Sequence, residues 1–201
     1  MRSLLCSIVI GSLLLSAKLE AGITYFSFDS APLEMVGQSR TDYYVSPDTD
    51  WSFSVSRNFA NGITVDIRSN DPEAPWTNYY WRLSFAAPLA EPLTPGIYEN
   101  ATRYPFQETA EPGLAVSGNH RGYSRVSGFF EIFEVVYGLS GEVLSFSADF
   151  TQYGDKSPDA WLVGEIRYNA TMIPEPTSVL LVLCGVCAAF MYRHRFGSTY
   201  R

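Results

Sequence analysis

Hydrophobic and polar residues alternate along much of the middle of the chain. Residues 51–56 read Trp-Ser-Phe-Ser-Val-Ser, and residues 63–68 read Ile-Thr-Val-Asp-Ile-Arg. Alternation with a period of two is typical of β-strands that bury one face. The Asn61-Gly62 pair between the two segments favours the positive φ angles of a tight turn. These residues therefore predict a hairpin.

Further segments of strand-like pattern follow, and prolines separate some of them. We predict additional strands at residues 23–28, 79–86, 97–103, 128–137, 143–151 and 161–168. The proline-rich stretches 71–75 and 87–96 are predicted to be loops, because proline is excluded from central strands. No segment between residues 22 and 173 has a convincing amphipathic helical pattern. We therefore expect an all-β fold, an antiparallel, jelly-roll-like β-sandwich of roughly eight or nine strands.

The segment from Phe129 to Phe150 gives the clearest single element, a long hairpin that turns through residues 138–141. Residues 129–136 are apolar on both faces except at Glu131 and Glu134, as expected of a strand central to two layers. We expect one buried face to be shared by Phe130, Ile132, Val136, Leu144, Phe146, Ala148 and Phe150.

The N-terminus has the pattern of a secretory signal. Arg2 precedes an apolar run over residues 4–15, and small residues follow it. We expect signal peptidase to cleave after Ala21, with Ala17 as the alternative position. An uncleaved membrane anchor is the other interpretation.

The C-terminus combines a rigid break, an apolar run and a basic end. Pro174-Glu175-Pro176 disfavours helix, residues 177–192 carry no charge, and Arg193 and Arg195 follow. As a helix this run would extend about 24 Å, against ~30 Å for the hydrocarbon core of a bilayer. The basic flank favours a membrane helix, and a buried soluble helix is the alternative.

This arrangement resembles the sorting tail of PEP-CTERM proteins, which the transpeptidase exosortase processes near the tripeptide. The resemblance implies a signal peptide at 1–21, an exported domain at 22–173, a sorting signal at 174–196 and a short tail at 197–201. It also implies signal peptidase and exosortase as partners. The protein would be anchored in the inner membrane before processing, and then lie at the cell surface or in the exopolysaccharide of a Gram-negative-type bacterium.

A second resemblance covers roughly residues 80–170. The ordered segments 98–107, 112–114, 117–118, 121–122, 134–137 and 147–150 resemble a family of uncharacterised exported bacterial β-rich domains. In that family a cysteine pair apparently forms a bridge at the places held here by Tyr123 and Gly154. The resemblance supports export and a β fold but implies no reaction.

Charge and cysteine content narrow the classes of function. Residues 22–173 contain 19 acidic and 9 basic residues, a net charge of −10. This balance argues against nucleic acid as a partner. All three cysteines, Cys6, Cys184 and Cys187, lie in the terminal segments, so the central domain has no disulfide.

The sequence offers few catalytic groups. His120, the single histidine of the central domain, lies in a glycine-rich turn, and no Gly-x-Ser-x-Gly motif occurs. Glu131 and Asp149 are candidates for the paired carboxylates of a glycoside hydrolase, although strand carboxylates are commonly solvated or paired with arginines such as Arg167. We expect a non-enzymatic protein, with a glycan hydrolase as the less favoured alternative.

Loop acids provide candidate ligands for structural calcium, the one cofactor that the sequence suggests. They are Asp48, Asp50, Asp71 and Glu73. They do not match an EF-hand loop, and solubilising turns are the simpler interpretation.

Clustered aromatics suggest a carbohydrate-binding surface. Trp76, Tyr79 and Tyr80 are candidate glycan contacts, while alternation along the strand would bury Trp81 and one tyrosine. The sequence thus predicts an exported envelope or exopolysaccharide-associated protein, alternatively a secreted carbohydrate-binding module.

Overall fold

The computed structural model describes residues 22–46, 50–70 and 80–171. Within them ten strands form, and the one helical segment is a short 3-10 turn, η1 (Pro88–Ala90). The strands are β1 (Ile23–Ser30), β2 (Thr41–Ser46), β3 (Trp51–Arg57), β4 (Ile63–Ser69), β5 (Tyr80–Ala86), β6 (Gly96–Arg103), β7 (Gly113–Gly118), β8 (Val126–Tyr137), β9 (Val143–Gly154) and β10 (Trp161–Ala170). The all-β class predicted from the sequence is confirmed.

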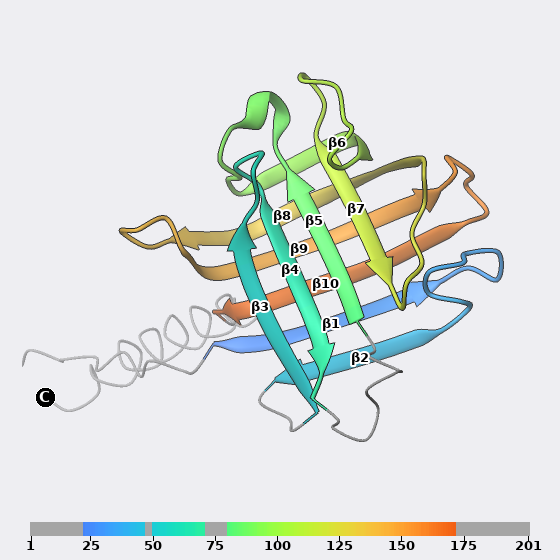
Figure 1. Cartoon of the computed structure of the whole chain (residues 1–201), viewed down its shortest axis with the longest axis horizontal. Coiled ribbons are helices and arrows are strands. Elements are labelled where there is room, and N and C mark those ends of the chain that lie inside the picture. Colours follow the sequence, from blue (N-terminus) through green and yellow to red (C-terminus); the bar gives the residue numbers. More distant parts are fainter. Residues whose placement is uncertain (1–21, 47–49, 71–79, 172–201) are drawn as a thin grey trace, which may run out of the picture.

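The ten strands belong to one continuous sheet, which curls over on itself. The strand order is β2-β1-β10-β9-β8-β6-β7-β5-β4-β3. Figure 1 shows β3, β4, β5 and β7 crossing in front of β1, β2, β8, β9 and β10. Neighbouring strands are antiparallel except β6 and β7, which pair in parallel over Thr102↔Gly113 and Arg103↔Leu114. The architecture is a nearly closed, barrel-like mixed sheet, in place of the predicted sandwich of eight or nine strands.

The eight predicted strands are all present, and two strands were missed. In β2 the adjacent Tyr43 and Tyr44 obscure the alternation, although Tyr44 is buried and Tyr43 is 62% exposed. In β7 glycines at both ends of Gly-Leu-Ala-Val-Ser-Gly read as turn residues. Burial in both strands depends on partners that are distant in sequence.

Aromatic rings fill the space between the two layers. Trp81, Phe26, Phe85, Phe130 and Phe150 are fully or almost fully buried. Phe85 of the front layer meets Phe130 of the back layer with ring centroids 5.3 Å apart. Burial of each such side chain contributes about 1.5–3 kcal/mol, so packing holds the layers together. Trp81 is in the core, as its place in the alternation predicted.

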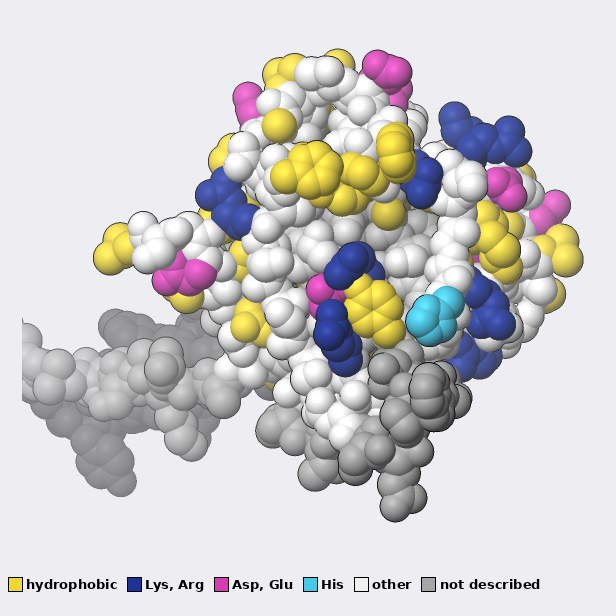
Figure 2. Space-filling view, in the orientation of Figure 1, with side chains coloured by type: hydrophobic (Ala, Val, Ile, Leu, Met, Phe, Trp, Pro, Cys, Tyr) yellow, Lys and Arg dark blue, Asp and Glu magenta, His cyan; other side chains and the backbone are white. Residues whose placement is uncertain are grey.

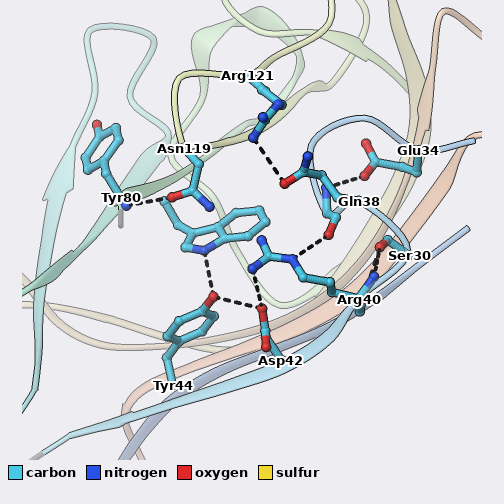
Figure 3. A network of polar contacts seen from close by, with 11 residues as sticks. Ser30, Glu34, Gln38, Arg40, Asp42, Tyr44, Tyr80, Asn119 and Arg121 are labelled. Carbon is cyan, nitrogen blue, oxygen red and sulfur yellow. Dashed lines mark hydrogen bonds and ion pairs between the residues drawn. The ribbon is translucent and has the colours of Figure 1, made fainter. Parts of the chain in front are cut away.

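A chain of polar contacts links the layers at one end of the core (Figure 3). The indole N–H of Trp81 on β5 donates to the hydroxyl of Tyr44 on β2, at 3.1 Å. That hydroxyl donates to Asp42 at 3.2 Å, and Arg40 forms an ion pair with the same carboxylate oxygen at 3.2 Å. The buried indole N–H thereby has a partner, which avoids the cost of an unsatisfied donor.

The loop between β1 and β2 folds around a buried carboxylate, Glu34 (Figure 3). Its two oxygens accept the backbone N–H groups of Val36 and Gly37. Burial raises the pKa of Glu34 above its ordinary value, and the N–H donors oppose that shift. The carboxylate therefore fixes the conformation of this loop from within.

The long hairpin contains two bulges that change its buried face. Ile132 pairs with Ala148 and Glu134 with Ser147, which leaves Phe133 without an opposite residue, and Leu144 is skipped in the same way between Ser145 and Val143. A bulge of one residue reverses which side chains point inward. The prediction that Val136 and Leu144 are buried is consequently wrong, since they are 44% and 48% exposed. Val135 and Tyr137 pack against the core instead.

The two positions held by cysteines in the resembling family are neighbours in space. A Cβ atom built on Gly154 would lie 2.1 Å from Cζ of Tyr123. Tyr123 is buried, and its hydroxyl accepts the backbone N–H of Met35 at 2.8 Å. The ring of Tyr123 therefore packs directly against Gly154.

The predicted terminal elements lie outside the described residues. They are the signal segment 1–21 with Ala21, the tripeptide Pro174-Glu175-Pro176, and the apolar run with Arg193 and Arg195. Within the part that the structure describes, none of the helical segments has the length and apolar character needed to span a membrane.

Candidate functional site

An irregularity in β6 opens a groove on the outer face of the sheet. Tyr98 pairs with Phe130 and Ala101 with Gly128, so Glu99 and Asn100 together lie opposite Phe129. Asn100 has a positive φ of 56°, a conformation that asparagine tolerates better than most residues. Such bulges bend a strand and redirect its side chains, often beside functional sites.

The resulting groove has a volume of about 730 Å³ and lies over β6, β8 and β9. Its aromatic lining comes from Phe129 and Tyr153, and Ile97 adds an aliphatic side chain. Phe129 is 45% exposed and Ile97 is 63% exposed. Solvent-facing apolar side chains inside a concave surface are typical of a binding site.

Hydrogen-bonding groups surround these apolar side chains. Asn100, Thr102 and Ser127 line the groove with Glu99, Glu111 and Glu131, and among the described residues no arginine, lysine or histidine takes part. Thr102 donates its hydroxyl hydrogen to Glu111 at 2.9 Å. Neither Glu99 nor Glu131 has a hydrogen bond or ion pair with another described residue. Their oxygens therefore stay available to accept hydrogen bonds from a ligand.

The carboxylate pair expected from the sequence lies on this face, and its two members are directly paired across neighbouring strands. Glu131 on β8 faces Asp149 on β9. Asp149, however, forms an ion pair of 2.8 Å with Arg167, which also contacts Glu165 at 3.2 Å. Asp149 is thus engaged by an arginine, as strand carboxylates commonly are, while Glu131 faces the groove.

Tyr80 is the one predicted glycan contact that the structure describes, since Trp76 and Tyr79 lie outside the described residues. Its hydroxyl donates to Asp66 at 2.7 Å. The guanidinium carbons of Arg68 and Arg82 each lie 5.4 Å from the centre of its ring. Because this ring already contacts two cations, it does not offer a free stacking face for a sugar.

The cluster formed by Asp66, Arg68, Tyr80 and Arg82, called the Asp66 cluster below, shifts the pKa values of Asp66 and Tyr80. Burial alone would raise the pKa of Asp66, but hydrogen bonds from Arg82 and Tyr80 and the charges of Arg82 and Arg68 lower it below its ordinary value. Burial and the hydrogen bond to Asp66 raise the pKa of Tyr80 to about 12. Asp66 is therefore held ionised and Tyr80 neutral, as in a structural ion-pair network.

The structure provides no calcium ligand set among the residues that it describes. Of the four candidate ligands, Asp48, Asp71 and Glu73 lie outside those residues. Asp50 is exposed, and its backbone carbonyl accepts the N–H of Asn70 at 2.8 Å. In the described ranges no three histidine, cysteine or carboxylate side chains lie close enough together to hold a metal ion.

His120, the candidate imidazole, lies exposed on the turn that follows β7. It has a positive φ of 64° and borders a hollow with Arg68 and Tyr80 rather than the groove. The structure therefore does not bring the histidine and the groove carboxylates together.

Sequence reasoning did not find the groove, although it singled out Glu131. The groove depends on Asn100 and Phe129, which belong to different strands and meet only through the β6–β8 pairing. The available signal was the Glu-Asn pair inside an otherwise regular strand, since asparagine is depleted in strands and tolerates a positive φ.

Comparisons with protein-family models, with curated proteins and with solved structures find no match to this chain.

Proposed function

We propose that the β domain is a carbohydrate-binding module that holds a segment of polysaccharide in the β6–β8 groove. The observation that carries this proposal is the combination of exposed Phe129 with unpaired Glu99 and Glu131 in one groove of about 730 Å³. A sugar ring has an apolar face and a rim of hydroxyl groups. The groove offers an aromatic surface for the former and acceptors for the latter.

The charge of the groove selects among polysaccharides. Three glutamates line it and no basic residue does. An acidic sugar would bring like charges together in a partly desolvated space, which is unfavourable. The preferred ligand is accordingly a neutral polysaccharide.

The proposed binding activity fits delivery outside the cell. The tail from Pro174 to Arg195 resembles a PEP-CTERM sorting signal, and residues 1–21 resemble a secretory signal. We propose that signal peptidase and exosortase process the two ends, so that the domain meets exopolysaccharide at the surface.

Replacing Phe129 by alanine is the direct test of the groove. Aromatic contacts contribute about 0.5–1.5 kcal/mol beyond their buried area, so the affinity for a neutral polysaccharide should fall about tenfold. Phe133→Ala is the matched control, because Phe133 lies on the same strand, is 37% exposed and does not line the groove. Affinity gel electrophoresis of the purified protein against a panel of neutral polysaccharides measures both variants.

Two results would count against the proposal. One is a wild-type protein that binds no neutral polysaccharide in the panel. The other is an equal loss of affinity in Phe129→Ala and Phe133→Ala, which would show that the groove is not the binding site.

A hydrolase is the second candidate, favoured by one observation, the glutamates Glu99, Glu111 and Glu131 in a single groove. The binding proposal expects no shortening of a bound polysaccharide during prolonged incubation. Size-exclusion chromatography of the polysaccharide distinguishes the two functions, since fragments that disappear with Glu131→Gln would establish hydrolysis.

A further inference from the structure

A second groove lies on the opposite layer of the molecule, over β5 and β7. Its volume is about 370 Å³, and its floor is formed by outward-facing residues that include Ser84 and Ser117. The turn at Tyr104 and the loop at Ser124 form part of its walls. Figure 2 shows this face of the molecule, where dark blue basic side chains lie near the centre beside a yellow ring and a magenta carboxylate.

Of the residues that the structure describes, two arginines and no carboxylate line this front groove. The guanidinium carbon of Arg103 lies 4.7 Å from the centre of the Phe106 ring, and Arg103 has no ion pair with any described residue. Arg82 is held by Asp66 through its Nε and Nη2 atoms, at 2.7 and 3.1 Å. Its guanidinium carbon also lies 5.4 Å from the centre of the Tyr80 ring. The groove thus presents one guanidinium group that lacks an ion pair and stacks on Phe106, and a second that is already paired with Asp66.

Hydroxyl donors complete the lining. Ser117, Ser124 and Tyr104 are among the residues that line the groove, whereas Ser84, also among them, is only 3% exposed. Ser84 shares a hydrogen bond of 3.1 Å with Thr64, and Ser117 makes one long contact of 3.5 Å with the carbonyl of Arg82. Guanidinium and hydroxyl donors around a small space are the groups that bind carboxylates, sulfates and phosphates.

We propose that the front groove is a second binding site, specific for a single anionic group carried on a sugar, with Arg103 as its principal contact. The overall charge of the domain is acidic, but the two grooves differ. The β6–β8 groove has three carboxylates and no cation among its lining residues, whereas this one has two arginines and no carboxylate. The site binds one carboxylate or sulfate group, and the acidic remainder of the domain limits the binding of long polyanions.

The test uses calorimetric titration of the full chain with three probes: a galacturonate trisaccharide, a neutral galactose trisaccharide and sodium sulfate. The galacturonate should bind, and its affinity should fall as salt is added, because the contact is between opposite charges near the surface. Binding of the neutral trisaccharide with equal affinity, or no binding of galacturonate, would overturn the proposal. Sulfate alone binding as tightly as galacturonate would show a free-anion site instead of a sugar site.

Arg103→Gln is the decisive variant, and Arg57→Gln is its matched control. Arg57 is also an exposed arginine on the front layer, with a hydrogen bond to Asn61 at 2.9 Å, and it does not line the groove. We expect Arg103→Gln to weaken galacturonate binding about tenfold and Arg57→Gln to leave it unchanged. A thermal melt of each variant confirms folding, and equal affinities in the two variants would refute the role of Arg103.

This site is independent of the one proposed for neutral polysaccharide. Phe129→Ala should leave galacturonate binding unchanged, and Arg103→Gln should leave neutral polysaccharide binding unchanged. Failure of one proposal is therefore distinguishable from failure of the other.

Discussion

Charged residues in this domain fall into two groups, those with partners inside the fold and those without. Asp66 and Arg82 are paired, as are Asp149 and Arg167. Glu131 and Arg103, by contrast, have no ion pair with another described residue and each lines a groove. At the residue scale, Glu131 and Arg103 are thus charged groups without ion pairs inside the two candidate sites, whereas the pairs Asp66–Arg82 and Asp149–Arg167 link neighbouring strands of the sheet.

The Asp66 cluster predicts how stability depends on pH. The pKa of Asp66 is lowered in the folded protein. The ionised carboxylate therefore stabilises the fold above the pKa that Asp66 has in the unfolded chain, about 3.9. That contribution is lost as the pH falls through the lower, folded pKa. We expect the melting temperature of the wild-type protein to fall more steeply below about pH 4 than that of Asp66→Asn.

Asp159→Asn provides the control for this prediction. Asp159 is exposed and has no ion pair with a described residue, so its variant should follow the wild-type curve. Melting curves for Asp66→Asn and the wild type that run parallel down to pH 2 would contradict the role given to the cluster.

At the scale of elements, the sequence predicted eight of the ten described strands but not how they bend. Alternation located β3 and β4 because each buries one face, and Ile63, Val65 and Ile67 are fully buried as predicted. The bulge at Phe133 could not be predicted, since neighbouring apolar residues on both faces of β8 fit either register. Bulges are set by pairing with another strand, which local patterning does not contain.

The same reason explains how much of the candidate site was predictable. Glu131 was identified from its place opposite Asp149 in a regular hairpin, and the pairing has that register. Asn100 and Phe129 were not identified, because they come together only when β6 pairs with β8 around a bulge. Tyr80 was identified as an aromatic, but its contact with Arg68 arises only when β4 pairs with β5.

On the scale of the whole molecule, a single curled sheet presents two outer faces with different chemistry. The face over β6 and β8 has an acidic, aromatic groove, and the face over β5 and β7 has a basic one. With both proposed sites occupied, the domain would hold a segment of neutral polysaccharide on one face and a sugar with a single anionic group on the other. That property would suit a protein proposed to work within exopolysaccharide.

The proposed route of delivery predicts the mass of the mature protein. Native material from outside the cell should begin near Gly22 and end near Pro174-Glu175-Pro176, as intact-mass spectrometry can establish. Replacing those three residues by alanine should preserve the C-terminal segment, whereas alanines at residues 197–199 should not affect processing. Recovery of the complete chain, with both ends present, from the cytosol would contradict the proposed export.

The most direct test of the central claim is an amide NMR titration of the protein with the neutral oligosaccharide that it binds most tightly on a glycan array. The account predicts that chemical-shift changes concentrate at residues 97–102, 127–131 and 153, around the β6–β8 groove. Changes centred on Ser84 and Ser117 of the opposite layer, or the absence of any neutral ligand on the array, would contradict it.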